Sequence, residues 1–230
     1  MSESTRHRLS HLLLAATLLL LLITFYQVFF VVPTERTMGV VQRIFYLHMP
    51  SAIVAFHSYF VVFVASIGYL MTRRLAWDRA AVSAAEVGTV FCAAVLVSGP
   101  LWAKPVWGIW WTWDARLTTT LVLFLIFVGY LMLRRYVEEA GRRAVLSAVV
   151  GIIGFVDVPL VYLANRLFRT QHPQPVIGGG PDSGLDPRMW VTVLWALAAL
   201  HALAGFLFWQ RYRLERMRAD VLDLYRRARA

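Results

Sequence analysis

The chain has 230 residues, of which 59% are hydrophobic and only 16% are charged. Soluble domains average about 45–50% apolar and about 25% charged residues, so this composition excludes an ordinary soluble domain. The formal net charge of +10 could indicate a nucleic-acid-binding protein, but the Lys and Arg residues stand in short clusters between long apolar runs. The single cysteine, Cys92, lies within an apolar run, which excludes an internal disulfide and predicts a small buried residue. We therefore expect one membrane domain covering residues 1–230.

Six apolar stretches are long enough to cross a bilayer as helices. A membrane helix needs about 20 mostly apolar residues, because its backbone polar groups must be satisfied internally. The first stretch continues to Val32 without a small-residue cleavage site, so it is read as an anchor and not as a signal peptide. The sequence predicts an all-α fold, a bundle of six transmembrane helices near residues 11–32, 51–71, 82–102, 119–133, 144–164 and 189–209.

The distribution of Lys and Arg predicts the orientation, since cytoplasmic loops carry the excess of these residues. The N-terminus, the second and fourth loops and the C-terminal tail hold 16 of them, and the other three loops hold 7. We therefore expect both termini and a basic tail at about 211–230 to be cytoplasmic. The outer loops are expected at about 33–50, 103–118 and 165–188, with the cationic residues Arg36, Arg43, Lys104, Arg116, Arg166, Arg169 and Arg188.

Tryptophan is concentrated in the second outer loop, where five of the nine residues of this type fall between positions 102 and 113. An interfacial aromatic belt is the ordinary explanation, but a belt spreads its rings over many helix ends. A platform for a flat ligand is therefore favoured. If the segment is helical, Trp107, Trp110 and Trp111 share one face with Asp114, and Pro105 suits the first turn of that helix.

The stretch from Trp107 to Thr118, WGIWWTWDARLT, closely resembles the tryptophan-rich signature of the haem-handling protein superfamily. The order of spans and loops is similar, over nearly the whole chain, to the six-span cytochrome c maturation protein C family, also called haem exporter protein C. This resemblance implies that haem, b type and transiently bound, rests against Trp107, Trp110, Trp111 and Trp113 at the periplasmic face of a bacterial inner membrane.

The same resemblance implies the partners of the protein. Haem would pass to a membrane-tethered periplasmic haem chaperone, which binds it covalently. Two ATP-binding cassette subunits and a small single-span membrane protein would complete the system. The chain itself contains no G-x-x-x-x-G-K-[ST] motif, so energy would have to come from these partners. The resemblance implies a binding and transfer protein more than an enzyme, although it could assist covalent attachment of haem to its partner.

Haem iron bound from both faces takes two imidazoles, or one imidazole and a thioether. In the family, one histidine before the second span and one in the last outer loop are axial ligands, and the resemblance assigns these roles to His48 and His172. The pattern YLHMP around His48 matches closely, and Pro50 is expected to start the second span. The match around His172 is looser, because only Phe168 supplies an aromatic ring there. Met49 is a rival ligand.

The polar edge of haem would need cationic partners. Charge-assisted hydrogen bonds from outer Arg and Lys residues could hold the two propionates. Arg43 and Arg116 are preferred because each adjoins a motif. Asp114 could pair with Arg116, with backbone groups or with the polar edge of the ligand. Residues 177–184, with four glycines and a proline, predict either a movable flap over the site or a connector.

Other function classes stay open on the sequence. His57 and His201 fall inside spans two and six, where they could hold haem b in an electron-transfer cytochrome. A cytochrome c synthase of the same superfamily is a further alternative, although such members usually carry additional spans or outer domains. Glu86 and Asp157, inside spans three and five, could serve a proton-coupled transporter. Glu86 could instead reach water, and Asp157 could hydrogen-bond a helix turn loosened by Pro159.

Overall fold

The computed structural model describes residues 3–168, 170–173 and 185–229. These residues form helices and connecting segments, with no β-strand among them. Six helical segments are long and apolar enough to cross a membrane, which confirms the all-α, six-span prediction. Each is longer than its apolar stretch: His7–Val31, Val40–Thr72, Leu75–Trp107, Ala115–Tyr136, Ala140–Leu167 and Pro187–Tyr225.

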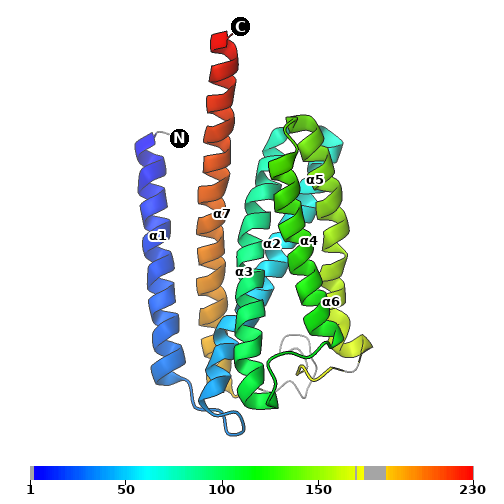
Figure 1. Cartoon of the computed structure of the whole chain (residues 1–230). Helices are drawn as coiled ribbons and strands as arrows, with labels where there is room; N and C mark the ends of the chain where they lie inside the picture. The colour runs from blue at the N-terminus through cyan, green and yellow to red at the C-terminus, as the bar shows by residue number, and fades with distance from the viewer. Residues whose placement is uncertain (1–2, 169, 174–184, 230) are drawn as a thin grey trace.

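The two ends of the chain lie at the same end of the bundle (Figure 1). The described residues of the segments that follow η1, α3 and α6 lie at the opposite end, called the loop end below. In chain order the elements are α1 (Glu3–Tyr26), a π-helical turn η1 (Gln27–Val31), a 3-10 turn η2 (Val40–Ile44), α2 (Phe45–Thr72), α3 (Leu75–Trp107), α4 (Ala115–Tyr136), α5 (Ala140–Phe155), α6 (Asp157–Leu167) and α7 (Pro187–Arg229).

The core lies where α2, α3 and α4 meet. Tyr59 is fully buried and stacks on Phe127, with ring centroids 3.7 Å apart. A Cβ atom at Gly88 would come within 2.8 Å of the Tyr59 ring, so α3 can approach α2 this closely only because position 88 has no side chain. This contact fixes the register of α2 against α3, from which the loop-end cavity is built.

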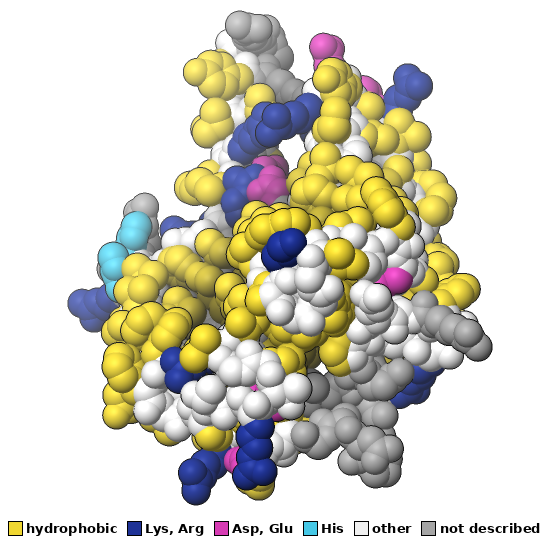
Figure 2. All heavy atoms as spheres, turned by 60° about the horizontal axis from the view of Figure 1, so that its bottom comes forward, with side chains coloured by type: hydrophobic (Ala, Val, Ile, Leu, Met, Phe, Trp, Pro, Cys, Tyr) yellow, Lys and Arg dark blue, Asp and Glu magenta, His cyan; other side chains and the backbone are white. Residues whose placement is uncertain are grey.

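The surface around this core is hydrophobic, as a bilayer requires. Figure 2 shows the loop end turned toward the viewer, with apolar side chains over most of the surface and separate Lys and Arg side chains between them. α1 packs beside α7, and Thr24 Oγ1 donates a hydrogen bond to the Trp195 carbonyl at 3.1 Å. The outer face of α1 is lined by exposed leucines such as Leu12, Leu19 and Leu22.

Several local predictions from the sequence are wrong. Pro50 does not start the second span but is the sixth residue of α2, so His48 lies in the first turn of that helix. Pro105 lies in the last turn of α3, and Gly108 ends that helix with a φ of 79°. Because a left-handed residue interrupts the helix there, Trp110, Trp111 and Asp114 are not on one helical face with Trp107.

The fifth span is divided into α5 and α6 at Val156. Pro159 has no N–H and cannot bond the Phe155 carbonyl, so a break one turn before it is the expected result of that residue type. Asp157 begins α6 and is buried, but its Oδ2 finds no hydrogen-bond partner among the described residues. The predicted hydrogen bond to the loosened turn is therefore not made by this oxygen.

Glu86 forms an ion pair, whereas the sequence also allowed a side chain that only reaches water. Both of its carboxylate oxygens accept hydrogen bonds from the Arg211 guanidinium, which also donates to Glu215 at 3.3 Å. The predicted tail begins as a continuation of α7, which remains helical to Arg229. The acid predicted as a transport candidate is thus part of an ion pair that joins α3 to α7.

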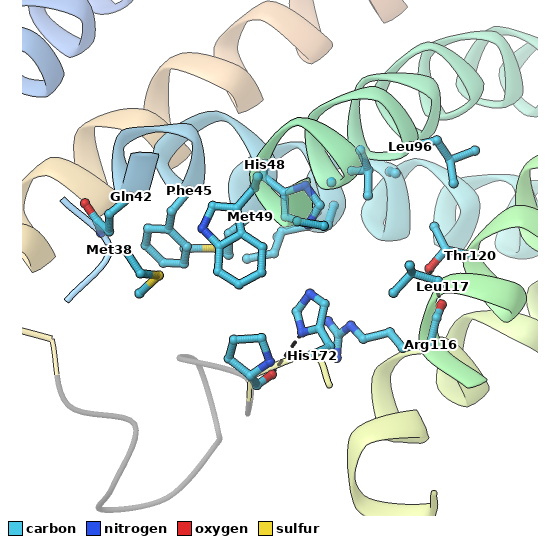
Figure 3. Close-up of a pocket in the computed structure, with 18 of the residues that line it drawn as sticks. Met38, Gln42, Phe45, His48, Met49, Leu96, Arg116, Leu117, Thr120 and His172 are labelled. Carbon is cyan, nitrogen blue, oxygen red and sulfur yellow. Dashed lines mark hydrogen bonds between the residues drawn. The ribbon is translucent and has the colours of Figure 1, made fainter. Parts of the chain in front are cut away.

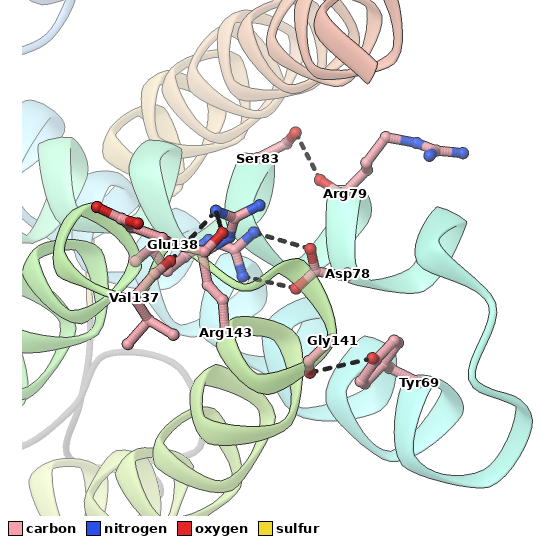
Figure 4. Close-up of polar contacts among 9 residues, drawn as sticks. Tyr69, Asp78, Arg79, Ser83, Val137, Glu138, Gly141 and Arg143 are labelled. Carbon is pink, nitrogen blue, oxygen red and sulfur yellow. Dashed lines mark hydrogen bonds and ion pairs between the residues drawn. The ribbon is translucent and has the colours of Figure 1, made fainter. Parts of the chain in front are cut away.

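A second ion pair, at the end where the termini lie, joins α3 to α4. Both Arg134 amino groups donate to the Asp78 carboxylate, at 2.6 and 2.8 Å, and the two side chains are only 10% and 11% exposed. Figure 4 shows Asp78 near the connection between α4 and α5, and Tyr69 donating to the Gly141 carbonyl in the first turn of α5.

Removing one partner of this pair should leave a buried charge. We expect Asp78→Asn to destabilise the protein by about 3–5 kcal/mol, the usual cost of leaving one member of a buried ion pair alone. The measurement is the midpoint of thermal unfolding in detergent micelles. Glu138→Gln, an exposed acid in the following connection, is the matched control and should leave the midpoint unchanged. Equal midpoints for the two variants would contradict the assignment.

Candidate functional site

A cavity of about 1180 Å³ opens between α2, α3, α4, α6 and α7 at the loop end. Ligand pockets usually measure about 300–1,000 Å³, so this one has room for a large ligand. Its wall is mostly apolar, with a few polar groups that include histidines and arginines. Figure 3 shows His48 and His172 on opposite sides of this space, with Arg116 beside His172.

The structure brings His48 of α2 and His172 of the last loop together. Their ring centroids are 6.3 Å apart and their planes make an angle of 32°. Both residues line the cavity, together with Met49, the rival ligand. Met49 is also packed against the apolar cluster around Tyr46 and Val193.

The hydrogen bonds of His48 determine which nitrogen carries its proton. Nδ1 lies 2.9 Å from Ser98 Oγ, and the Ser98 hydroxyl donates to the Ala94 carbonyl at 2.6 Å. Since that hydroxyl hydrogen is already used, Ser98 Oγ accepts the hydrogen of His48 Nδ1. The neutral ring therefore presents Nε2 with a free electron pair.

His172 is also held by a hydrogen bond from Nδ1, which leaves its Nε2 unprotonated. Its Nδ1 donates to the Pro173 carbonyl at 2.9 Å, because a carbonyl oxygen can only accept. Burial of the ring, together with the positive charge of Arg116, lowers the pKa of His172 to about 3. The imidazole is thus neutral at physiological pH and again presents an unprotonated Nε2. Metal-binding histidines are usually oriented in this way, through a hydrogen bond from the other nitrogen.

Asn165, at the end of α6, holds the His172 segment in place. Its amide nitrogen donates to the carbonyls of His172 and Pro173, at 3.3 and 2.6 Å. Its amide oxygen accepts a hydrogen bond from Arg116 Nη1 at 3.0 Å. One buried side chain therefore joins α4, α6 and the last loop, and sets Arg116 at the edge of the cavity beside His172.

The predicted tryptophan platform divides into two groups. Trp107 and Trp111 line the cavity with Trp102, whose ring meets Trp107 edge-on at 5.0 Å. Trp111 Nε1 is buried and has no hydrogen-bond partner among the described residues. Trp110 and Trp113 are 55% and 77% exposed and do not line the cavity. Trp107 and Trp111 thus belong to the cavity wall, whereas Trp110 and Trp113 lie on the surface.

The charged residues predicted to bind the polar edge of haem also differ in position, and only some of them line the cavity. Asp114 caps α4 by accepting hydrogen bonds from the backbone of Arg116 and Leu117, at 3.0 and 3.1 Å. Arg43 donates to the Phe29 carbonyl at 3.3 Å and is not among the residues that line the cavity, unlike Arg116. The cavity wall contains two other arginines that the motifs did not single out, Arg36 and Arg188.

The histidines inside spans two and six, His57 and His201, line the same cavity, although the side chain of His57 is also exposed. His57 Nδ1 and His201 Nε2 are only 2.9 Å apart and share a hydrogen bond. Two axial bonds of about 2 Å would need roughly 4 Å between the nitrogens. No iron fits between these two atoms as they stand, which argues against the cytochrome alternative with both histidines as ligands.

Sequence reasoning missed Ser98, Asn165 and Trp102. Ser98 lies in an apolar span, where its role depends on which helix faces it. Asn165 offered a weak signal, as a buried amide at a helix end close to the last loop. The predicted flap at 177–184 and the cationic Arg169 lie outside the described residues.

A family model described as heme exporter protein C matches residues 2–228 of the chain. The chain belongs to this family. The heme exporter protein C of Bradyrhizobium diazoefficiens is 33% identical over 210 residues, covering 91% of this chain and 78% of that protein. That of Escherichia coli K12 is 31% identical over 198 residues, covering 84% and 79%. A putative cytochrome c biosynthesis ccmC-like mitochondrial protein of Marchantia polymorpha is 28% identical over 178 residues, covering 77% and 75%.

Family membership supports a role in haem handling for cytochrome c maturation, so the cavity can be compared with haem. Two imidazoles that bind one iron from opposite sides each have an iron–nitrogen bond of about 2 Å. In a five-membered ring with sides of about 1.35 Å, the centroid lies roughly 1.1 Å behind that nitrogen, so the two centroids would be roughly 6 Å apart. The ring centroids of His48 and His172 are 6.3 Å apart. The unpaired N–H of Trp111 is a further donor for the polar edge of such a ligand. The residues present therefore suit haem.

Asn165 should control the order of the His172 segment. In Asn165→Ala the bonds to the two carbonyls and to Arg116 are lost, and each such bond contributes about 0.5–1.5 kcal/mol. We expect exchange of the backbone amides of residues 170–172 to rise by roughly five- to 150-fold, the equivalent of the two lost bonds to the carbonyls, measured by hydrogen–deuterium exchange with mass spectrometry. Gln171→Ala, an exposed neighbour, is the control. Unchanged exchange in Asn165→Ala would show that other contacts order the segment.

Proposed function

We propose that this chain binds haem transiently in the loop-end cavity, with His48 and His172 as axial ligands, and passes it to a periplasmic haem chaperone. The observation that carries the proposal is a pair of neutral imidazoles that line one apolar cavity, each with a free Nε2. Their ring centroids are 6.3 Å apart. Haem supplies an iron that accepts two axial nitrogens and a flat apolar ring. Haem is here the cargo, of b type until the acceptor takes it.

The walls of the cavity suit the remaining parts of this cargo. Trp107 and Trp111 offer aromatic surface to the porphyrin, whose apolar face is removed from water on binding. Arg116, held by Asn165, offers a charged donor to a propionate, and Trp111 Nε1 offers a neutral one. We propose these two donors ahead of Arg43, whose guanidinium is engaged by Phe29. Asp114 would act through the start of α4 and not on haem itself.

We place the loop end on the periplasmic side of a bacterial inner membrane and both termini in the cytoplasm. The support is the excess of Lys and Arg at the end where the termini lie, 16 against 7. Haem held at the loop end would then be accessible to a periplasmic acceptor. The cavity opens at this end, which suits a cargo that is held and released.

The partners follow from this arrangement. The exposed rings of Trp110 and Trp113 adjoin the residues that line the cavity, so they are proposed as contacts for the haem chaperone. Such contacts could also assist covalent attachment of haem to that partner. Two ATP-binding cassette subunits and a small single-span protein are proposed as further components. We place no catalytic residue in this chain.

The histidine assignment has a spectroscopic test. Protein purified with haem should show a low-spin, six-coordinate spectrum, and His48→Ala and His172→Ala should each abolish it and lower the haem retained through purification by about tenfold or more. Ser98→Ala should weaken retention by about tenfold, because the proton of His48 is no longer held on Nδ1.

The controls for this test remove groups of the same kinds outside the proposed site. His11→Ala removes an exposed histidine of α1, and Ser51→Ala removes a buried hydroxyl of α2 that has no partner among the described residues. Both should leave the spectrum unchanged. A low-spin spectrum that survives in both His48→Ala and His172→Ala would refute the assignment.

The tryptophans should separate haem retention from haem transfer. Trp111→Phe removes a buried N–H from the cavity and should lower retention about fivefold, the equivalent of one hydrogen bond of roughly 1 kcal/mol. Trp110→Phe should retain haem normally but reduce its transfer to purified acceptor. The measurements are haem per protein and covalent haem on the acceptor, at equal membrane levels of both variants. Normal retention and transfer in both would favour a plain interfacial belt.

A further inference from the structure

His57, a cavity-lining residue whose side chain is also exposed, has a third imidazole nitrogen with a free electron pair. His201 Nδ1 lies 2.7 Å from the Leu197 carbonyl, which can only accept, so Nδ1 carries the proton and a neutral His201 has a bare Nε2. That bare nitrogen lies 2.9 Å from His57 Nδ1, which must therefore donate. The other nitrogen of His57, Nε2, is left unprotonated, and it accepts no hydrogen bond from the residues that the structure describes.

This arrangement repeats the one found at His48 and His172. In all three rings Nδ1 donates to a fixed oxygen or nitrogen, and Nε2 carries a free electron pair. His201 differs, because both of its nitrogens are engaged. His57 thus has the properties of a ligand, and His201 those of the residue that orients it.

The position of His57 is distinct from the outer site. It follows His48 by nine residues in the same helix, α2, which places it about 13.5 Å further along the helix axis and two and a half turns around it. The two residues therefore lie at opposite edges of the face of α2 that borders the cavity. An iron bound at one of them cannot be bound at the other.

The class of ligand follows from the number of donors. A bare zinc or copper ion needs three or four protein ligands, and the described residues contain no group of three His, Cys, Asp or Glu side chains that could hold a metal. Haem brings four porphyrin nitrogens to its iron and needs only one or two from the protein. A single oriented histidine in a large apolar cavity therefore suits haem better than a free ion.

We propose that His57, oriented by His201, is a second iron ligand, which binds haem at an inner position of the cavity before or after the outer pair does. The proposal rests on the proposed function, because it assumes the same cargo. His201 is a positioning residue: it holds the proton of His57 on Nδ1 and makes no bond to iron itself. The cavity would then bind one cargo at two depths.

The test uses the full-length protein in detergent, with both outer ligands removed by His48→Ala and His172→Ala, and ferric haem as the titrant. We expect this double variant to bind one haem with a high-spin, five-coordinate spectrum. Adding His57→Ala should abolish binding. Adding His201→Leu should weaken it by about 10- to 100-fold, the usual effect of removing a partner that orients a metal ligand. With His201→Gln in place of His201→Leu, binding should equal that of the double variant, because the glutamine amide oxygen can accept the hydrogen of His57 Nδ1.

Each outcome separates the inner site from the outer one. If the double variant binds no haem, or binds it equally well after His57→Ala, the inner site does not exist, whereas the outer assignment still stands on the low-spin spectrum of the unsubstituted protein. If His201→Leu and His201→Gln behave alike, His201 does not act through the proton of His57. The thermal unfolding midpoint in detergent checks that the variants with His57→Ala still fold, and it should match that of the double variant.

Discussion

A histidine can offer one nitrogen to iron in a fixed direction only when its other nitrogen is held by a hydrogen bond. The site of this protein depends on that constraint. His48 Nδ1 donates this bond to Ser98 Oγ on the neighbouring helix, and His172 Nδ1 donates it to the Pro173 carbonyl. The first of these requires that α2 and α3 stay in register, because a shift of one turn would move Ser98 about 5.4 Å away.

The rest of the bundle preserves this register. Gly88 lets α3 approach the Tyr59 ring, and the stack of Tyr59 on Phe127 adds α4 to the same core. At the far end, the Asp78–Arg134 pair fastens α3 to α4. The described residues 170–173 around His172 belong to none of these contacts and are held by hydrogen bonds from Asn165 and to Thr170. One proposed axial ligand is thus fixed by helix packing, and the other by hydrogen bonds within and beside its own loop.

The long apolar runs were sufficient to predict six spans, because the bilayer allows few alternatives for a chain of this composition. The signature WGIWWTWDARLT contributes residues to the cavity wall, but the shared helical face considered for its tryptophans does not form, because the segment leaves the helix between Trp107 and Ala115. The reason is local: Gly108 adopts a positive φ that a periodicity argument does not detect. Pro159 likewise divided a span that appeared continuous by hydropathy alone.

Contacts between distant segments could not be predicted from one sequence. Nothing near Ser98 or Asn165 indicates which side chain each meets, and Arg43 was preferred to Arg36 only because it adjoins a motif. The pairing of His57 with His201 depends on the register of α2 against α7, which the span boundaries did not fix. Sequence patterns predicted the residue types of the site, whereas the hydrogen bonds that orient them emerged only from the fold.

The central claim is that iron is held between His48 Nε2 and His172 Nε2. A cryo-electron microscopy structure of the haem-loaded protein with its partner subunits would test it most directly. The account predicts density for one porphyrin between these two rings, with the Nδ1 bonds to Ser98 and Pro173 intact and Trp107 and Trp111 against the porphyrin. Haem bound through Met49, or outside the loop-end cavity altogether, would contradict it.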